Sequence, residues 1–271
     1  MLTYLLCAVP LSFCYSDQSS PQKTPERALA EQAAFQNALS GISDSVVRIE
    51  PSGLSVATLQ GTRSTIQPTG PSTGLVVGAD GWILTTEFAV PSDIDEVVIT
   101  LPPKKKTADN LASSPRRLVG RVTGRDLNRG LVLLKCEPTK PLTEPQFVSR
   151  EDVRPGEWAL AVGRVWDLEE PSVAVGIISA VDRCWGRAIQ TDAAVSPVNY
   201  GGPLLSIRGL VFGIIAPLPA ETAGMTTGTE LYDSGVGFAI PMYDIIPLIP
   251  RLKNGETLKP GLLGIGYSAQ D

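Results

Sequence analysis

The sequence predicts an all-β protein in which antiparallel strands build barrels or a sandwich, with a short helix ahead of them. Short apolar runs rich in valine and isoleucine follow one another from residue 45, and each has the length of a strand. Glycine and proline are frequent, with 26 and 23 copies in 271 residues, and they punctuate the runs as turns do. Only 6% of the residues are aromatic and 43% are hydrophobic, which favours many short strands over long helices. The length allows one or two domains.

The first segment, residues 1–16, reads MLTYLLCAVPLSFCYS and carries no charged side chain. A membrane span needs about 20 apolar residues, so this run is short for one. It is typical of the apolar part of a secretory signal peptide that is cut before Asp17. We therefore expect residues 1–16 to direct export. Because no basic residue precedes the apolar run, an N-terminus without a targeting role is the alternative.

Residues 17–44 are expected to form a polar linker followed by a helix. The stretch 25–40 places alanine and leucine at helical spacing, with glutamate and glutamine between them. Thr24 suits the N-cap, Pro25 suits the first helical position, and Gly41 suits the end of the helix. We expect this helix to pack across a β-domain.

The strands are predicted from a series of apolar runs that begins at Ser45. A basic, irregular stretch from Lys104 to Arg117 interrupts the series. It is interpreted as a solvated surface loop, with a docking patch for anions as the alternative. In order, the predicted strands are SVVRIE, TGLVVG, WILTT, EVVITL, RLVGRVTG, GLVLLKC, WALAVG, VAVGIISAV, LVFGIIAPL and GVGFAIP.

The composition excludes several kinds of chemistry. The chain contains no histidine, so no imidazole can act as a general base in a Ser-His-Asp or Cys-His mechanism. The formal net charge of −5 disfavours nucleic acid as a partner. Cys136 and Cys184 lie far apart and without the CxxC spacing of zinc or redox sites, so they are either two buried thiols or one disulfide. No cofactor and no metal are expected.

The most informative string is TDAAVSPVNYGGPLL, at residues 191–205. It resembles the nucleophile motif T-D-A-A-x-x-P-G-N-S-G-G-P-L of the HtrA-type trypsin-like serine proteases, which are exported quality-control enzymes. STGLVV at 72–77, ADGWILT at 79–85, VRPGEWALAVG at 153–163 and VGFAIP at 236–241 agree with the same family. The resemblance implies two six-stranded antiparallel β-barrels of the trypsin-like (chymotrypsin-like) fold. They are expected over residues 45–140 and 141–245, with the active-site cleft between them.

The resemblance also locates the family's catalytic triad, and this chain differs at all three positions. Phe88 stands where the general base follows an I-L-T string, and Gly130 stands where the acid opens D-L-A-L-L-K. Tyr200 stands where the nucleophile lies in G-N-S-G-G. These replacements cannot share a proton, so the chain is expected to be a pseudoprotease.

The oxyanion hole of the family uses backbone N–H groups that fall on Val198 and Tyr200. A β-branched residue is strongly disfavoured at the positive φ that glycine adopts freely, so we expect a different loop conformation. We also expect the rings of Phe88 and Tyr200 to pack together across the cleft. The further candidates for the cleft or for peptide binding are Asn199, Gly201, Ile214 and Trp166.

The function expected from this reading is that of a catalytically inactive HtrA-like homologue that binds or scaffolds proteins in the cell envelope, in the periplasm. The expected partners are unfolded or extended polypeptides, other envelope proteins, and further copies of the chain in a homo-oligomer. The alternative is a serine-type endopeptidase of the same family with an unconventional catalytic apparatus. Its candidate groups are the hydroxyls of Ser196 and Ser206 and the carboxylates of Asp192 and Glu87.

The C-terminal residues 246–271 are expected to form a tail. Residues 242–253 suit a short helix that is interrupted at Pro247 and Pro250. KPGLLGI at 259–265 resembles the start of a PDZ domain, a module that follows the protease in this family. The resemblance implies that such a module was lost or that the reading frame is truncated.

Overall fold

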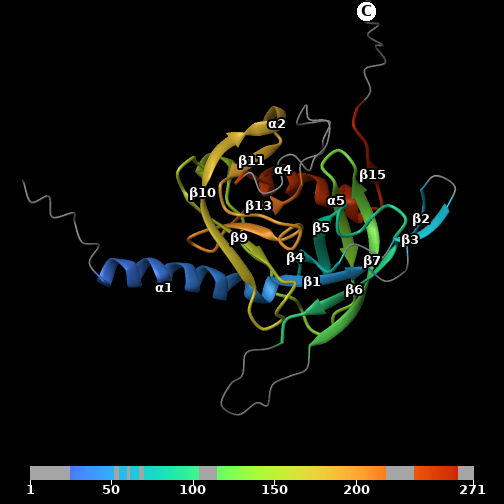
Figure 1. The fold of residues 1–271 in the computed structure, drawn as a ribbon, viewed down its shortest axis with the longest axis horizontal. Coiled ribbons are helices and arrows are strands. Elements are labelled where there is room, and N and C mark those ends of the chain that lie inside the picture. Colours follow the sequence, from blue (N-terminus) through green and yellow to red (C-terminus); the bar gives the residue numbers. More distant parts are fainter. Residues whose placement is uncertain are drawn as a thin grey trace, which may run out of the picture.

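Two closed β-barrels contain most strands of the chain in a computed structural model (Figure 1). The structure describes residues 25–51, 70–103, 115–217 and 235–261, together with the backbone of two strands at 55–59 and 62–66. The expected signal peptide, the linker at 17–24, Lys104–Lys106 and most of the PDZ-like string lie outside the described residues.

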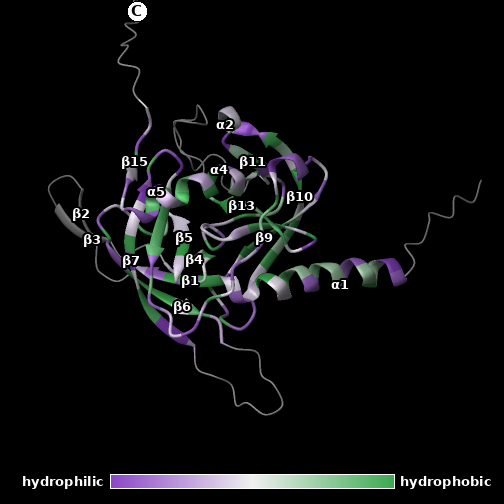
Figure 2. Cartoon of the chain, turned by 180° about the vertical axis from the view of Figure 1, so that it is seen from behind, coloured by the Kyte–Doolittle hydropathy of each residue, from purple (hydrophilic) through white to green (hydrophobic). Residues whose placement is uncertain are grey.

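Helix α1, Pro25–Ile42, begins at the predicted residue and ends two residues after the predicted stretch. Only its C-terminal half packs on the barrels: Ala38 and Ile42 are buried, and the ring of Phe35 meets the edge of Trp158 with 5.4 Å between centroids. The N-terminal half is exposed and points away from the barrels (Figure 1). Figure 2 shows hydrophilic residues at that far end, whereas the barrel strands are largely hydrophobic.

The first barrel consists of six antiparallel strands in the order β7-β6-β1-β4-β5-β8, and pairing of β8 with β7 closes it. Its interior is filled by valine and isoleucine side chains that alternate along these strands, such as Val47, Ile49, Ile83 and Ile99. The strands are β1 (Val46–Pro51), β4 (Ser72–Gly78), β5 (Trp82–Thr86), β6 (Glu96–Leu101), β7 (Arg116–Asp126) and β8 (Leu131–Lys135), with a separate hairpin of β2 (Ser55–Leu59) and β3 (Thr62–Ile66). Arg116 and Arg117, the end of the predicted basic loop, belong to β7.

The second barrel is closed in the order β10-β11-β14-β13-β12-β9. Small side chains of β9, Ala159 and Ala161, face larger ones such as Phe212 and Ile178 in its interior. The strands are β9 (Trp158–Gly163), β10 (Ser172–Asp182), β11 (Ala188–Thr191), β12 (Pro203–Ser206), β13 (Val211–Ile215) and β14 (Gly237–Pro241), with short helices η2 (Arg150–Asp152) and α2 (Arg183–Gly186) in the connections. The predicted fold class of two six-stranded barrels with an N-terminal helix is therefore confirmed.

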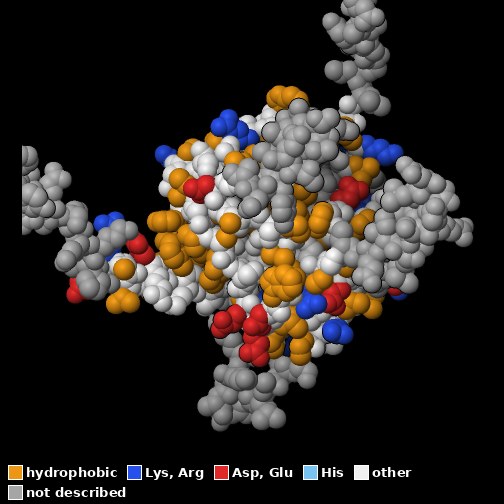
Figure 3. Space-filling view, in the orientation of Figure 1, with side chains coloured by type: hydrophobic (Ala, Val, Ile, Leu, Met, Phe, Trp, Pro, Cys, Tyr) orange, Lys and Arg blue, Asp and Glu red, His pale blue; other side chains and the backbone are white. Residues whose placement is uncertain are grey.

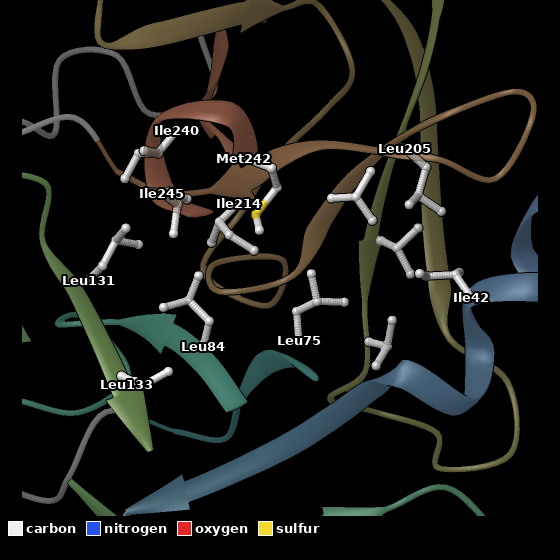
Figure 4. Close-up of a cluster of buried hydrophobic side chains, with 14 of the residues drawn as sticks. Ile42, Leu75, Leu84, Leu131, Leu133, Leu205, Ile214, Ile240, Met242 and Ile245 are labelled. Atoms are coloured by element: carbon white, nitrogen blue, oxygen red, sulfur yellow. The ribbon is translucent and has the colours of Figure 1, made fainter. Parts of the chain in front are cut away.

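The largest core lies between the two barrels (Figure 4). Leu75, Leu84, Leu131 and Leu133 reach into it from the first barrel, and Leu205, Ile214 and Ile240 reach into it from the second. All seven side chains are buried, so the barrels share a hydrophobic interior that holds them together.

The chain crosses back to the first barrel after β14. Helix α4 (Met242–Ile245) packs on β13 and β14, a turn η4 (Ile246–Leu248) follows, and α5 (Ile249–Lys253) packs on β7 and β8. Strand β15 (Thr257–Leu258) then pairs in parallel with β7. The helix is thus broken in the region of the two prolines, as predicted, and residues 242–258 bridge both barrels.

Two further observations concern possible cross-links and membrane spans. The thiols of Cys136 and Cys184 are both free, so the alternative of a disulfide between them is wrong. Within the residues that the structure describes, no helix has the length and apolar character that crossing a membrane requires.

Candidate functional site

Phe88 and Tyr200 approach each other from different barrels. Phe88 lies in the turn after β5, and Tyr200 lies in the loop that leads into β12. Their ring centroids are 5.2 Å apart, and the ring planes meet at 82°. This edge-to-face geometry is favourable because the positive rim of one ring meets the negative face of the other. The contact expected from the sequence is therefore present.

Gly130 lies beside the segment that carries Phe88. Its carbonyl accepts a hydrogen bond of 2.8 Å from the N–H of Glu87. The residue ends the turn between β7 and β8 with a φ of +64°, and a Cβ built there would meet open space. The structure thus brings positions 88, 130 and 200 to one part of the seam between the barrels. The site holds two aromatic rings and a glycine, and none of these three residues supplies an imidazole or a carboxylate.

The loop at 197–200 is a closed turn. The N–H of Tyr200 donates to the carbonyl of Pro197 over 3.3 Å, and Val198 is not among the described non-glycine residues with positive φ. The carbonyl of Val198 in turn accepts a hydrogen bond of 2.7 Å from the Thr73 hydroxyl. The Tyr200 N–H, which an oxyanion would need as a hydrogen-bond donor, therefore already donates to the Pro197 carbonyl.

The other predicted cleft residues have different surroundings. A Cβ on Gly201 would lie 2.1 Å from the carbonyl of Thr73, and φ is +84°, so only glycine fits there. Asn199 is buried, and its side-chain oxygen accepts from the N–H and the hydroxyl of Ser196. Both residues shape the loop. Ile214 is fully buried in the core between the barrels, so its side chain cannot contact a peptide, and that prediction is wrong.

Ser196, Asp192 and Ser206, three of the candidate groups for an unconventional hydrolase, make hydrogen bonds within the fold. The Ser196 hydroxyl lies 3.3 Å from the amide oxygen of Asn199, which is not a base. Asp192 accepts from the N–H of Ile177 over 2.6 Å, as expected of a structural turn residue. The Ser206 hydroxyl is buried and accepts from the N–H of Leu210 over 3.2 Å.

An apolar pocket of about 250 Å³ opens beside Phe88. Trp166 forms part of its wall and is 80% exposed. The described lining also includes Val165, next to Trp166, and two further segments of the chain, Gly70 with Pro71 and Pro197 with Val198.

A second, smaller cavity of about 30 Å³ lies beyond Gly130, where the two barrels meet. The Arg187 guanidinium crosses from the second barrel to donate to Asn128 over 2.8 Å. Cys184 is half-buried in this lining, and burial raises the pKa of its thiol while Arg187 and Arg183 partly oppose the rise. A raised pKa keeps the thiol protonated at neutral pH, so Cys184 is a poor nucleophile there.

Sequence reasoning missed the two residues that hold this site together. Thr73 is buried; its hydroxyl accepts from the N–H of Arg164 over 2.9 Å, in addition to its bond to Val198. Arg164 is fully buried, and its guanidinium donates to the carbonyl of Leu168 and to the carbonyl and hydroxyl of Ser43. Burial lowers the pKa of Arg164, and Asp44 and Asp167 partly offset that effect. The contacts join residues 91 and 121 positions apart, so no local motif could have revealed them.

Comparisons with known proteins agree with this fold. The model of a trypsin-like peptidase domain matches residues 72–214. The proteins named "Probable periplasmic serine endoprotease DegP-like" from Ectopseudomonas mendocina and Rickettsia conorii are each 31% identical over 71% of this chain. The chain spans only 37% and 35% of their respective lengths.

Two solved structures share the architecture. The serine endoprotease from Yersinia pestis superimposes with a TM-score of 0.60 at 22% identity, over 81% of this chain and 66% of that one. Deg5 superimposes with a TM-score of 0.62 at 24% identity, over 83% of this chain and 97% of that one. At these sequence identities, the structural similarity supports a shared fold and nothing further.

Proposed function

The chain belongs to the trypsin-like peptidase family, and from this premise we propose that it is a catalytically inactive member that binds or scaffolds other polypeptides. The observation that carries the proposal is the contact between Phe88 and Tyr200, with ring centroids 5.2 Å apart at the junction of the barrels. In a serine peptidase of this family, a base and a nucleophile are expected at these positions. Removing either one lowers turnover by about 10⁶.

The turn at 197–200 supports the same proposal. Peptidases whose triad is removed keep a remnant of about 10³ to 10⁴ over the reaction in water, and that remnant depends on the oxyanion hole. Here the Tyr200 N–H already donates to the carbonyl of Pro197. The remnant is therefore expected to be absent as well.

Binding of a polypeptide requires a surface that accepts it but requires no catalytic groups. The two barrels are closed and share one hydrophobic core, and an apolar pocket opens beside Phe88, so a peptide has a preformed surface to bind. Extended chains bind to β-proteins by adding a strand to an exposed edge, with side chains fitting into pockets. We propose unfolded or extended polypeptides, or other envelope proteins, as the ligands, with assembly of several copies as a further possibility to test.

The proposed location is the periplasm or another part of the cell envelope. The relatives from Ectopseudomonas mendocina and Rickettsia conorii are named as periplasmic proteins. The apolar segment at residues 1–16 suits export of this chain in the same way. Cell fractionation with an antibody against the protein tests this: recovery in the cytosolic fraction contradicts the proposal.

The experiment for activity uses the purified protein with a fluorophosphonate probe and with fluorescein-labelled β-casein. We expect no labelling and no cleavage, together with a rise in fluorescence anisotropy as the protein binds the casein. Labelling that disappears in Ser196→Ala, with casein cleavage, would establish instead the alternative of an unconventional serine endopeptidase. Absence of casein binding at micromolar protein contradicts the binding role.

A further inference from the structure

We propose that the apolar pocket beside Phe88 binds one large apolar side chain, such as phenylalanine, leucine or methionine, of an extended peptide that lies in the cleft. The inference rests on the proposed binding function and assigns it a specificity. The pocket is the 250 Å³ space lined by Gly70, Pro71, Phe88, Val165, Trp166, Pro197 and Val198.

The size and chemistry of the lining select this ligand. A cavity of about 150 Å³ is enough to hold a benzene ring, so the pocket accommodates one large side chain and not a folded partner. Among the lining residues that the structure describes, none carries a charge or a polar side chain other than the indole of Trp166. A carboxylate, phosphate or ammonium group would lose its hydration there without gaining an ionic partner, which disfavours charged ligands.

The two aromatic walls come from different barrels. Phe88 follows β5 of the first barrel, and Trp166 follows β9 of the second. Both rings line the pocket, so a side chain that fills it meets aromatic surface from both barrels. Trp166 is 80% exposed, a large apolar area left in water until something covers it. Tryptophan in such a position is typical of residues that dominate the free energy of protein binding.

The walls are held in place before any ligand arrives. The Thr73 hydroxyl bonds both the carbonyl of Val198 and the N–H of Arg164, at 2.7 and 2.9 Å. The Ser72 hydroxyl bonds the carbonyl of Tyr200 at 2.9 Å. The buried guanidinium of Arg164 holds the carbonyl of Leu168, so the loop that carries Trp166 is fixed on both sides of that residue. A preformed pocket loses little conformational entropy on binding, and this fixation has that effect.

The pocket also adjoins the part of the cleft that the proposed function uses. Phe88 is at once a wall of the pocket and a partner of Tyr200. A peptide main chain passing over these two rings therefore has the pocket mouth beside it. The pocket is open to solvent, which suits a side chain whose main chain stays outside.

The test uses fluorescein-labelled nonapeptides of serine and threonine that differ only at the central residue, which is Phe, Leu, Ser or Asp. A single apolar residue fixes which part of the peptide enters the pocket. Anisotropy titrations are expected to show the Phe and Leu peptides binding about 10-fold to 100-fold tighter than the Ser peptide, the gain that burial of one such side chain supplies. The Asp peptide is expected to bind no better than the Ser peptide.

Two matched variants localise the effect. Trp166→Ala should remove the preference for Phe over Ser, whereas Trp185→Ala should keep it, since Trp185 is 82% exposed but lies outside the pocket. The protein has four tryptophans, so labelling with 5-fluorotryptophan gives a fluorine spectrum in which the Trp166 resonance is identified by its loss in Trp166→Phe. That resonance should shift as the Phe peptide is added.

The outcomes separate this inference from the proposed function. If casein binds but the four peptides bind equally, or if Trp166→Ala keeps the preference for Phe, the pocket assignment is wrong and the binding function stands. If neither casein nor any peptide binds, both the proposed function and the pocket assignment are wrong.

Discussion

At the residue scale, the contact between Phe88 and Tyr200 joins the two barrels at the positions where the resemblance to the family places catalytic groups. In an active site of this family the corresponding groups are polar, and keeping such groups desolvated usually costs stability. Here two rings from different barrels meet edge to face. Each ring therefore contributes to holding the barrels together, and this contribution can be measured.

A double-mutant cycle measures that contribution. We expect Phe88→Ala and Tyr200→Ala each to lower the free energy of unfolding, and the double variant to lose about 0.5–1.5 kcal/mol less than the sum, because the pair interaction is lost only once. Urea denaturation of the four proteins gives the values. Additive losses would show that the two rings do not stabilise each other.

Cys136 gives the protein a specific alkaline sensitivity. Burial raises the pKa of its thiol from 9.0 to about 11, with Lys135 opposing the rise. The native thiol keeps its proton at a pH where the unfolded chain has lost it. The free energy of unfolding therefore keeps the full contribution of this thiol below about pH 9. The contribution is lost as the pH rises from about 9 to about 11, and the total loss is about 2–3 kcal/mol.

The measurement compares the wild type with Cys136→Val, a variant without a titratable group. Urea denaturation at pH 8 and pH 10.5 should show a larger loss in the wild type than in the variant, since lysine and tyrosine titrations are common to both. Equal losses in the two proteins contradict the assignment to Cys136.

The location of a single residue was predictable where a sequence motif fixes its position. It was not predictable where tertiary packing decides whether the side chain is buried. The strings around Phe88, Gly130 and Tyr200 located those positions, and the ring contact followed. Ile214 was misjudged because both faces of β13 are covered: Phe212 fills the second barrel while Ile214 faces the first. A strand buried on both sides reads as a continuous apolar run, so its sequence does not tell which side chain meets a cleft.

At the scale of elements, the turn at 197–200 limits what restoring the triad can achieve. The triple revertant Phe88→His, Gly130→Asp and Tyr200→Ser is expected to cleave casein only weakly, since the N–H at position 200 donates to Pro197. Adding Val198→Gly should raise activity, because glycine permits the positive φ that turns the peptide group outward. Rates of casein cleavage by the two proteins decide. Full activity of the triple revertant alone would contradict this account.

Most strands were predictable because β-branched runs between turns are a strong local signal. Three short strands were not predicted. Strand β11 lies just before the motif at 191–205, β12 lies at the end of that motif, and β15 has only two residues. Such short elements gain their conformation from neighbouring strands, which the local sequence does not contain. The helix α1 was predicted nearly to the residue from its first proline and its spacing.

An exposed apolar surface lies on the second barrel beside the end of helix α1. Trp158, Val173 and Val175 are about two-fifths exposed there, at 43%, 39% and 42%. In Figure 3 hydrophobic side chains gather on this face beside the base of the helix. The surface lies on strands β9 and β10, and the contact of Phe35 with Trp158 covers part of it.

At the scale of the whole molecule, residues 242–258 hold the barrels in one body. Gly124 of β7 allows their close approach: a Cβ there would lie 2.4 Å from the carbonyl oxygen of Leu252 and 2.8 Å from its Cα. Gly124→Ala should therefore push α5 off the first barrel and lower the free energy of unfolding by about 1–3 kcal/mol.

Gly41→Ala is the matched control. A Cβ at Gly41, within α1, meets nothing within 4 Å. The change should be neutral or stabilise the protein by up to about 1 kcal/mol, because alanine favours the helix. Urea denaturation of both variants checks the pair, and an unchanged midpoint for Gly124→Ala contradicts the role given to α5.

The return of the chain to its first barrel also sets an order of folding. Strand β7 receives its parallel partner only from Thr257 and Leu258, and Leu252 is buried against the same barrel. The first barrel therefore cannot reach its final packing until Leu252, Thr257 and Leu258 have been synthesised. Contacts between residues so far apart in sequence form slowly, since a long loop must close first. A chain whose first barrel is completed late stays unfolded for longer, and an unfolded chain is the form that the proposed export would require.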